Sequence, residues 1–172
     1  RMLTFGSKGK AVAPGMVSAS DLKLLYRADQ LNDNTGIYGV VGNPVMHSLS
    51  PQIHNPGFQR IHYNAVYVPF LADSIRSFLS LAEMLRMRGF SVTVPFKVDV
   101  LKYLGNITRE VKLIGSCNTV VRVPNMWKGT NTDYYGFIHP IEKEIDEGRI
   151  KSALIIGAGG AAKAIIWALK MR

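Results

Sequence analysis

The chain has 172 residues, of which 47% are hydrophobic and 19% are charged. This composition is typical of a folded globular protein and excludes a disordered one, while the length excludes a small module held together by disulfides. Its one cysteine, Cys117, excludes an internal disulfide and a zinc site built from several cysteines, and it fits a reducing compartment.

The excess of basic residues is spread along the chain. There are 21 lysines and arginines against 12 acidic residues, which gives a net charge of +9, and no segment gathers the basic residues into a stripe. We therefore expect no nucleic-acid partner and favour a small anionic ligand. The most apolar stretch, residues 153–169, contains three glycines and Lys163, so we expect no membrane span and no membrane partner. No secretory signal is visible, and we expect an intracellular protein.

Short β-rich runs alternate with helix-length stretches from residue 37 onward, which is typical of an α/β fold with a mostly parallel sheet. Near the start of this region, Ser50 and Pro51 predict a helix with serine as its N-cap, and Pro56 predicts that this helix is short or bent. A second helix, over residues 73–87, has apolar residues at helical spacing and a capping aspartate. The strands predicted here cover residues 37–41, 65–70 and 90–94.

The second half of the chain continues this alternation and closes with a distinctive unit. Its predicted elements are helical runs over residues 98–104 and 108–114, a hairpin over 118–131 and a helix over 133–147. A strand over residues 153–156, a glycine turn and a helix over 161–170 then follow. This succession is typical of the start of a dinucleotide-binding unit, which cannot form a domain alone. Because the chain also begins without methionine, we expect it to be a fragment.

The glycine turn is the first chemical signal. Gly157 permits a tight turn, Gly159 allows a phosphate to approach the backbone, and the following helix would offer its N–H groups to a pyrophosphate. A plain packing turn between a helix and a sheet is the alternative. Nothing up to Arg172 distinguishes NAD from NADP, because the residue that does so lies about twenty positions after the turn.

Two further signals follow predicted strands. Ser48 and Ser50 come after the first strand and could hold a carboxylate or a polyol, or serve only as a cap and a solvated residue. Lys97 follows the third strand and is a candidate for proton transfer, although it could be an ordinary surface lysine. Asp133 begins a predicted helix and could be its N-cap. The histidines lack carboxylates at ligand spacing, so we expect no metal.

In combination, these motifs resemble shikimate dehydrogenases from residue 37 to the end. The segments are GNPVMHSLSPQIHN, FSVTVPFK, IGSCNTVV, GTNTDYYG and LIIGAGGAAKA, in the order and spacing of that family. The resemblance implies a three-layer α/β/α substrate-binding domain, then the truncated start of a Rossmann NADP-binding domain. It also implies NADP-dependent, reversible reduction of 3-dehydroshikimate to shikimate in aromatic amino acid biosynthesis, with a cytoplasmic location in a bacterium and a plastid location in a plant.

The resemblance implies a role for each matching position. Lys97 would be the acid/base group with Asp133 beside it, and Ser48 and Ser50 would bind the substrate carboxylate. Thr93, Asn118 and Asp133 would hold ring hydroxyls. The pyrophosphate of NADP would lie on Gly157, Gly159, Gly160 and Ala161.

The first thirty residues resemble the end of a type I dehydroquinate dehydratase barrel. This implies a piece of a bifunctional dehydratase/dehydrogenase, with a dehydratase remnant over residues 1–30, a linker over 31–36, a catalytic domain over 37–132 and a truncated cofactor domain over 133–172. We expect this chain to be inactive on its own. The alternatives are a quinate/shikimate dehydrogenase that uses NAD and a non-catalytic sensor that keeps the pocket; retention of Lys97 and Asp133 favours an enzyme.

Overall fold

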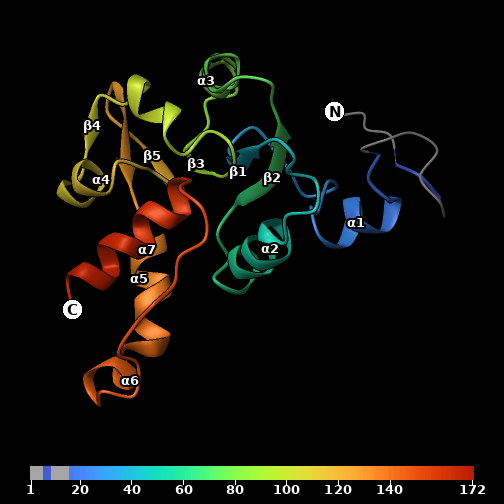
Figure 1. Cartoon of the computed structure of the whole chain (residues 1–172). Helices are drawn as coiled ribbons and strands as arrows, with labels where there is room; N and C mark the ends of the chain where they lie inside the picture. The colour runs from blue at the N-terminus through green and yellow to red at the C-terminus, as the bar shows by residue number, and fades with distance from the viewer. Residues whose placement is uncertain (1–5, 9–15) are drawn as a thin grey trace.

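The computed structural model describes residues 6–8 and 16–172 and is built around one sheet (Figure 1). The sheet has six strands in the order β2-β1-β3-β5-β6-β4. Strand β1 pairs in parallel with β2 and β3, β4 pairs in parallel with β6, and β5 is antiparallel to both its neighbours. The strands are β1 (Gly36–Gly42), β2 (Ala65–Leu71), β3 (Gly89–Val92), β4 (Asn106–Ile107), β5 (Thr119–Val123) and β6 (Met126–Thr130). The predicted α/β class with a mostly parallel sheet is confirmed.

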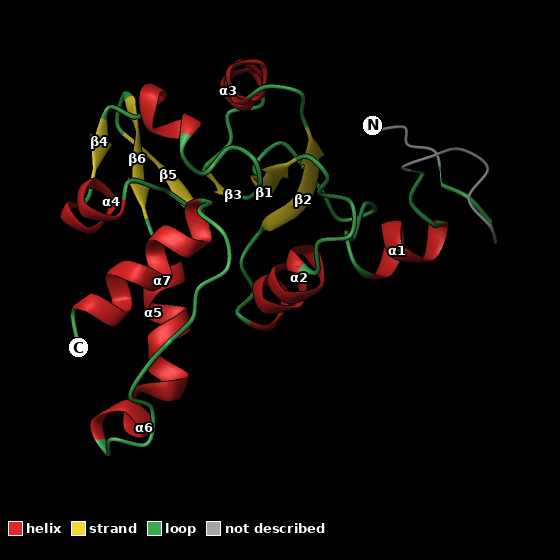
Figure 2. Ribbon diagram, viewed as in Figure 1, coloured by secondary structure: helices red, strands yellow, loops and turns green. Residues whose placement is uncertain are grey.

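Helices cover both faces of this sheet (Figure 2). Val40 and Val41 are successive residues of β1, so their side chains point to opposite faces. Val41 packs with Phe78 of α3, whereas Val40 packs with Phe58 of α2. The helices are α1 (Ala19–Leu24), α2 (Ser50–Arg60), α3 (Ile75–Met84), η1 (Asp99–Tyr103), α4 (Arg109–Ile114), α5 (Asp133–Ile138), η2 (His139–Ile141), α6 (Glu142–Asp146) and α7 (Gly160–Lys170).

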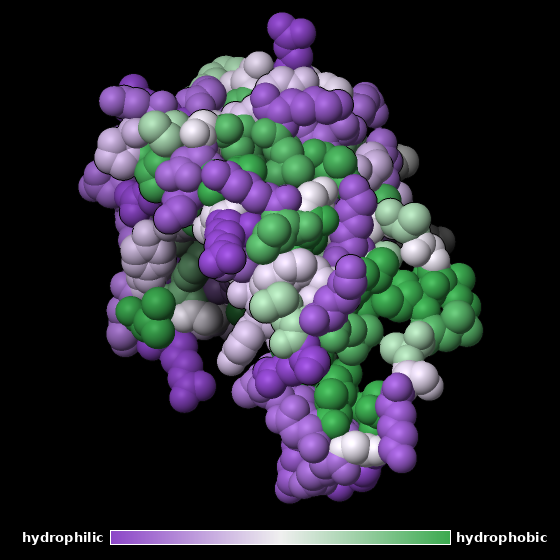
Figure 3. All heavy atoms as spheres, turned by 60° about the vertical axis from the view of Figure 1, so that its left-hand side comes forward, coloured by the Kyte–Doolittle hydropathy of each residue, from purple (hydrophilic) through white to green (hydrophobic). Residues whose placement is uncertain are grey.

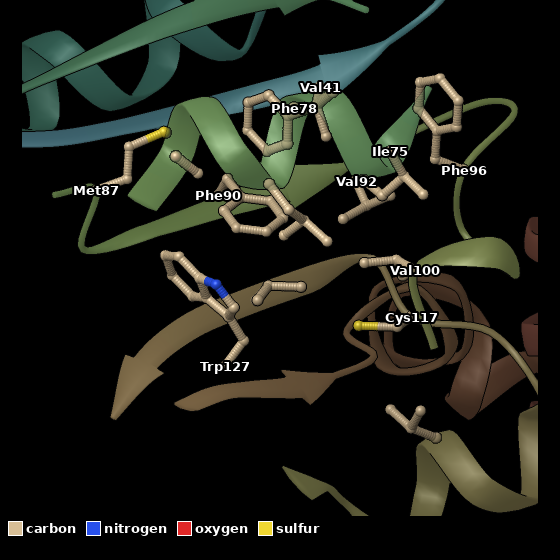
Figure 4. Packing of buried hydrophobic residues seen from close by; sticks show 14 residues of the cluster. Val41, Ile75, Phe78, Met87, Phe90, Val92, Phe96, Val100, Cys117 and Trp127 are labelled. Carbon is tan, nitrogen blue, oxygen red and sulfur yellow. The ribbon is translucent and has the colours of Figure 1, made fainter. Parts of the chain in front are cut away.

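The larger hydrophobic core lies between α3 and the sheet (Figure 4). Phe78 of α3 packs edge-on against Phe90 of β3, with ring centroids 4.9 Å apart, and Phe90 packs in the same way against Trp127 of β6 at 5.1 Å. Aromatic rings favour this arrangement, which adds to the free energy gained by burying them. The row of rings therefore joins the hairpin of β5 and β6 to the parallel part of the sheet.

Two predicted helix starts are wrong by one position. Helix α2 begins with Ser50 as its first residue and receives no side-chain cap, and it continues through Pro56 for 11 residues. Pro56 lies on the exposed side of α2, where water can reach the carbonyl that loses its hydrogen bond. In α3 the cap is Ser74, whose hydroxyl oxygen accepts from the backbone N–H of Ser77, and not Asp73.

Two predicted elements near the end of the chain also differ. The helix expected over residues 133–147 is divided into α5, η2 and α6, and Pro140 lies in the short middle turn. The strand expected over residues 153–156 is absent, because none of the described strands pairs with it, and Leu154 and Ile156 are 87% and 91% exposed. Hydrophobic atoms reach the surface in several places on the face in Figure 3.

Two expectations concern other parts of the chain. The dehydratase-like residues before Met16 lie largely outside the described residues. Within the described part, no helix is both long enough and apolar enough to span a bilayer.

Candidate active site

The polar residues predicted for the site gather at one edge of the sheet. Strands β1, β3 and β6 end at this edge, and β5 begins there because it runs in the opposite direction. The loop after β1 carries the two serines, the chain after β3 carries Thr93 and Lys97, and the chain after β6 carries Asp133. Asn118 immediately precedes β5. The carboxyl ends of parallel strands are where open α/β sheets bind ligands.

A pocket of about 300 Å³ opens at this edge. It is large enough for a small polar molecule. All six residues predicted to hold substrate or move protons line it. The lining consists of Val40, Pro44, Val45, His47, Ser48, Ser50, Ser91, Val92, Thr93, Lys97, Asn118 and Asp133.

Lys97 and Asp133 form an ion pair inside this pocket. The Lys97 Nζ atom lies 2.7 Å from Asp133 Oδ2, and the side chains are only 16% and 26% exposed. The amide Nδ2 of Asn118 donates to the other oxygen, Asp133 Oδ1, at 2.7 Å. Asn118 is held in turn because its Oδ1 accepts from the backbone N–H of Thr132 at 2.8 Å. Both oxygens of the Asp133 carboxylate are thus hydrogen bonded. The carboxylate is held in place by Asn118, and it in turn holds the Lys97 amine at the pocket.

The serine pair lines the same pocket. Ser48 Oγ donates to Ser50 Oγ at 3.0 Å and accepts from the backbone N–H of Ser50 at 3.3 Å. This arrangement gives two hydroxyl groups at the start of α2, where the helix dipole favours a negative ligand. With the Lys97 amine in the same pocket, the site has the polar groups to bind a small anion and to donate a proton.

Ser91 and His47 also line the pocket, and sequence analysis did not predict either as a site residue. Ser91 accepts a hydrogen bond from the hydroxyl of Tyr67 at 2.8 Å. Burial raises the pKa of Tyr67, and the bond to Ser91 opposes this in part, so the phenol stays protonated. Strand periodicity offered a signal for Ser91, because it lies two residues before Thr93 and so shares its face.

The glycine turn lies against Lys97. Gly159 is the N-cap residue of α7, and no side chain caps this helix, so its first N–H groups remain available to a ligand. Gly157 has a φ of +113°, which only glycine adopts readily, and a Cβ atom added at Gly157 or Gly159 would meet nothing within 4 Å. A Cβ at Gly160 would lie 2.8 Å from Lys97 Cβ. These residues, with Ala161 in the first turn of α7, fit a pyrophosphate beside the lysine.

Neither a reactive thiol nor a metal cluster is found in the described part of the chain. Cys117 is fully buried, and this burial raises its pKa to about 11, which keeps the thiol protonated and unreactive. Among residues 6–8 and 16–172, no group of three His, Cys, Asp or Glu side chains is placed to hold a metal ion. The polar side chains that line the pocket are its hydroxyls, the Asn118 amide, the His47 imidazole and the Lys97–Asp133 pair.

Residues 40–120 match the family described as the shikimate dehydrogenase substrate binding domain. This segment contains the serine pair, Thr93, Lys97 and Asn118. Over these residues the chain is similar to the shikimate dehydrogenases. Asp133 and the glycine turn follow the matched segment and complete the site described above.

Relatives of known name extend the similarity beyond this domain. Shikimate dehydrogenase (NADP(+)) of Caldanaerobacter subterraneus is 41% identical over 142 residues, which cover 81% of this chain and 51% of that protein. The chloroplastic bifunctional 3-dehydroquinate dehydratase/shikimate dehydrogenase of Arabidopsis thaliana is 36% identical over 185 residues, which cover 98% of this chain and 31% of the Arabidopsis protein. The crystal structure of shikimate dehydrogenase from Aquifex aeolicus superposes with a TM-score of 0.76 at 38% identity, over 82% of this chain and 54% of that one. The chain thus spans about half the length of the monofunctional relatives.

Proposed function

We propose that this chain is the substrate-binding half of an NADP-dependent shikimate dehydrogenase, which interconverts 3-dehydroshikimate and shikimate. The observation that carries this proposal is the Lys97–Asp133 ion pair, at 2.7 Å, in the same pocket as the serine pair. A pathway sensor would need the pocket but would not need a charged amine held by a carboxylate. The names of the relatives support the reaction and the cofactor.

Lys97 and Asp133 would supply the proton that the reduction requires. When bound, NADPH supplies a hydride to the carbonyl carbon of 3-dehydroshikimate. The oxygen that gains negative charge takes a proton from Lys97 Nζ, which becomes a neutral amine and regains a proton from solvent. Asp133 holds the Lys97 amine in place for this step through the ion pair at 2.7 Å.

The remaining polar groups orient the substrate. Ser48 and Ser50 would hold the substrate carboxylate. Thr93, Asn118 and Asp133 would form hydrogen bonds with the ring hydroxyls. The turn from Gly157 to Ala161 would hold the NADP pyrophosphate, and its contact with Lys97 supports placing the cofactor next to the proton donor.

We also propose a domain arrangement for the larger protein. The Arabidopsis relative, whose similarity covers 98% of this chain, supports a dehydratase-like remnant over residues 1–30 and a linker over 31–36. Residues 37–132 would form the substrate-binding domain and residues 133–172 the start of the cofactor domain. The protein would act in the plastid of a plant or the cytoplasm of a bacterium.

The test replaces Lys97 by alanine in the full-length product of the gene that encodes this chain. The rate of NADPH consumption with 3-dehydroshikimate should fall by about 100-fold or more in kcat, because the proton donor is lost. The KM for 3-dehydroshikimate should change by less than about threefold, since the serine pair remains.

The matched control is Lys102→Ala, which removes a lysine from an exposed ion pair of similar length with Asp99. This variant should retain the kcat of the parent protein. An unchanged kcat in Lys97→Ala would refute the role of Lys97. Faster turnover of quinate with NAD⁺ than of shikimate with NADP⁺ in the parent protein would replace the proposed substrate and cofactor.

A further inference from the structure

Two buried polar residues lie behind the active site, and the reaction described above does not use them. Ser116 is 0% exposed and Asn131 is 2% exposed. Neither lines the pocket, and neither was predicted as a site residue. Buried polar groups cost free energy unless they are hydrogen bonded, so the partners of these two residues indicate what holds them there.

Their hydrogen bonds form one continuous chain from Asp133 to the glycine turn. The backbone N–H of Asp133 donates to Asn131 Oδ1 at 2.9 Å. Asn131 Nδ2 donates to Ser116 Oγ at 3.2 Å and to the Ser116 carbonyl at 3.0 Å. Ser116 Oγ then donates to the carbonyl of Gly160 at 2.9 Å. Asn131 and Ser116 thus each accept one hydrogen bond and donate another along this chain.

This chain of bonds connects the first residues of two helices. Asp133 begins α5 and Gly160 begins α7, and the two helices also pack through an edge-on contact of Tyr134 with Trp167 at 4.7 Å. Gly160 at the same time lies against the side chain of Lys97. This chain of buried hydrogen bonds therefore contributes, together with the packing of α5 on α7, to the relative position of the acid/base pair and the glycine turn.

We propose that Ser116 and Asn131 are positioning residues that hold the cofactor-binding turn at a fixed place relative to Lys97 and Asp133. The effect of this positioning on the reaction rate rests on the proposed function. Hydride and proton must reach adjacent atoms of one carbonyl group, so the alignment of their two donors limits the rate. Neither Ser116 nor Asn131 lines the substrate pocket.

The first experiment measures hydrogen–deuterium exchange of backbone amides in the chain itself, so it requires no activity. Ser116→Ala removes the bond to Gly160 and the bond from Asn131 Nδ2 to Ser116 Oγ, whereas Asn131 keeps the Ser116 carbonyl as an acceptor. Exchange should become faster in the first hydrogen-bonded turn of α7 and remain unchanged in α5. Asn131→Ala removes the middle of the chain of bonds, and exchange should become faster at the start of both helices.

The control is Asn55→Ala, which removes another buried asparagine that bonds to backbone, between α2 and β2. It should speed exchange in those two elements and leave α5 and α7 unchanged. Ser116→Cys keeps nearly the same volume with a much weaker donor, so it separates the hydrogen bond from packing and should behave like Ser116→Ala.

The second experiment measures kinetics in the full-length gene product. Ser116→Ala should raise the KM for NADPH about fivefold, as expected for one hydrogen bond, and leave the KM for 3-dehydroshikimate unchanged. Ser116→Ala and Asn131→Ala should be less than additive in kcat when combined, whereas Ser116→Ala and Asn55→Ala should be additive.

Equal changes in both KM values, additive effects of the Ser116 and Asn131 variants, or unchanged exchange at the start of α7 would each overturn the inference. Failure of the proposed function gives a different result. In that case the parent protein would not reduce 3-dehydroshikimate, while the exchange pattern of the variants would remain as described.

Discussion

The side chain of Asn55 forms the hydrogen bonds with the backbone of β2 that a neighbouring strand would otherwise form. The residue is 1% exposed, and its side chain donates to the Tyr67 carbonyl at 2.9 Å and accepts from the Tyr67 backbone N–H at 2.8 Å. Strand β2 is at the edge of the sheet, so these backbone groups face away from β1. The amide of Asn55 thus completes an edge that would otherwise be unsatisfied, and it anchors α2 to the sheet.

We predict that Asn55→Ala lowers the free energy of unfolding of the chain by about 2 to 4 kcal/mol, because it leaves two backbone groups without partners. Urea unfolding followed by circular dichroism provides the measurement. Asn64→Ala is the control, since Asn64 is exposed and its side chain bonds to Asn32, and it should cost less than about 1 kcal/mol. Equal losses in the two variants would contradict this account of the edge.

At this scale, sequence patterns identified residues that lie next to strand ends. Lys97 and Asp133 are 36 positions apart, and each was a candidate because it follows a predicted strand. The Ser116–Asn131 contact could not be predicted in the same way. It requires the chain before β5, the chain after β6 and the start of α7 to meet, and no local pattern encodes that meeting.

Helix α3 shows how one side chain determines where an element begins. Ser74 has an extended backbone, and its hydroxyl oxygen accepts from the N–H of Ser77 at 3.1 Å. Ile75, Phe78 and Leu79 then face the core. The spacing of its apolar residues predicts this helix, but the sequence does not distinguish Asp73 from Ser74 as its cap, because aspartate and serine are about equally good N-caps.

Ser74→Ala should therefore lower the free energy of unfolding by about 1 kcal/mol. The matched control is Ser80→Ala on the exposed side of the same helix, where alanine is the better helix former and stability should stay the same or rise slightly. Thermal or urea unfolding of both variants measures the difference. A similar loss from Ser80→Ala would mean that the hydroxyl at the N-cap has no special role.

For the molecule as a whole, alternation of strands and helices was sufficient to predict the parallel part of the sheet and the hairpin. The two-residue strand β4 was not predicted, because so short a segment has no periodicity of its own. The strand expected over residues 153–156 has the right composition but forms no pairs. Apolar composition makes a segment suitable for a sheet, whereas backbone hydrogen bonds to a neighbour make it a strand.

It follows that Leu154 and Ile156, which are almost fully exposed, add little to the stability of the chain. The double variant Leu154→Ser and Ile156→Ser should change the free energy of unfolding by less than about 0.5 kcal/mol. Val92→Ala, in the core at 2% exposure, should cost about 2 kcal/mol. Chemical denaturation of the two proteins gives the comparison, and a loss in the serine variant as large as that in Val92→Ala would disprove the prediction.

Gly160 lies against Lys97 and is also the first residue of α7, so two features of the structure restrict this position. A side chain here would collide with Lys97 Cβ at 2.8 Å, and the same residue begins the helix whose N–H groups would receive the cofactor. Under the proposed function, a side chain at this position would disturb proton delivery and nucleotide affinity together. Under the proposed function, a change of nicotinamide preference is therefore expected at other positions, where nucleotide affinity can change without proton delivery.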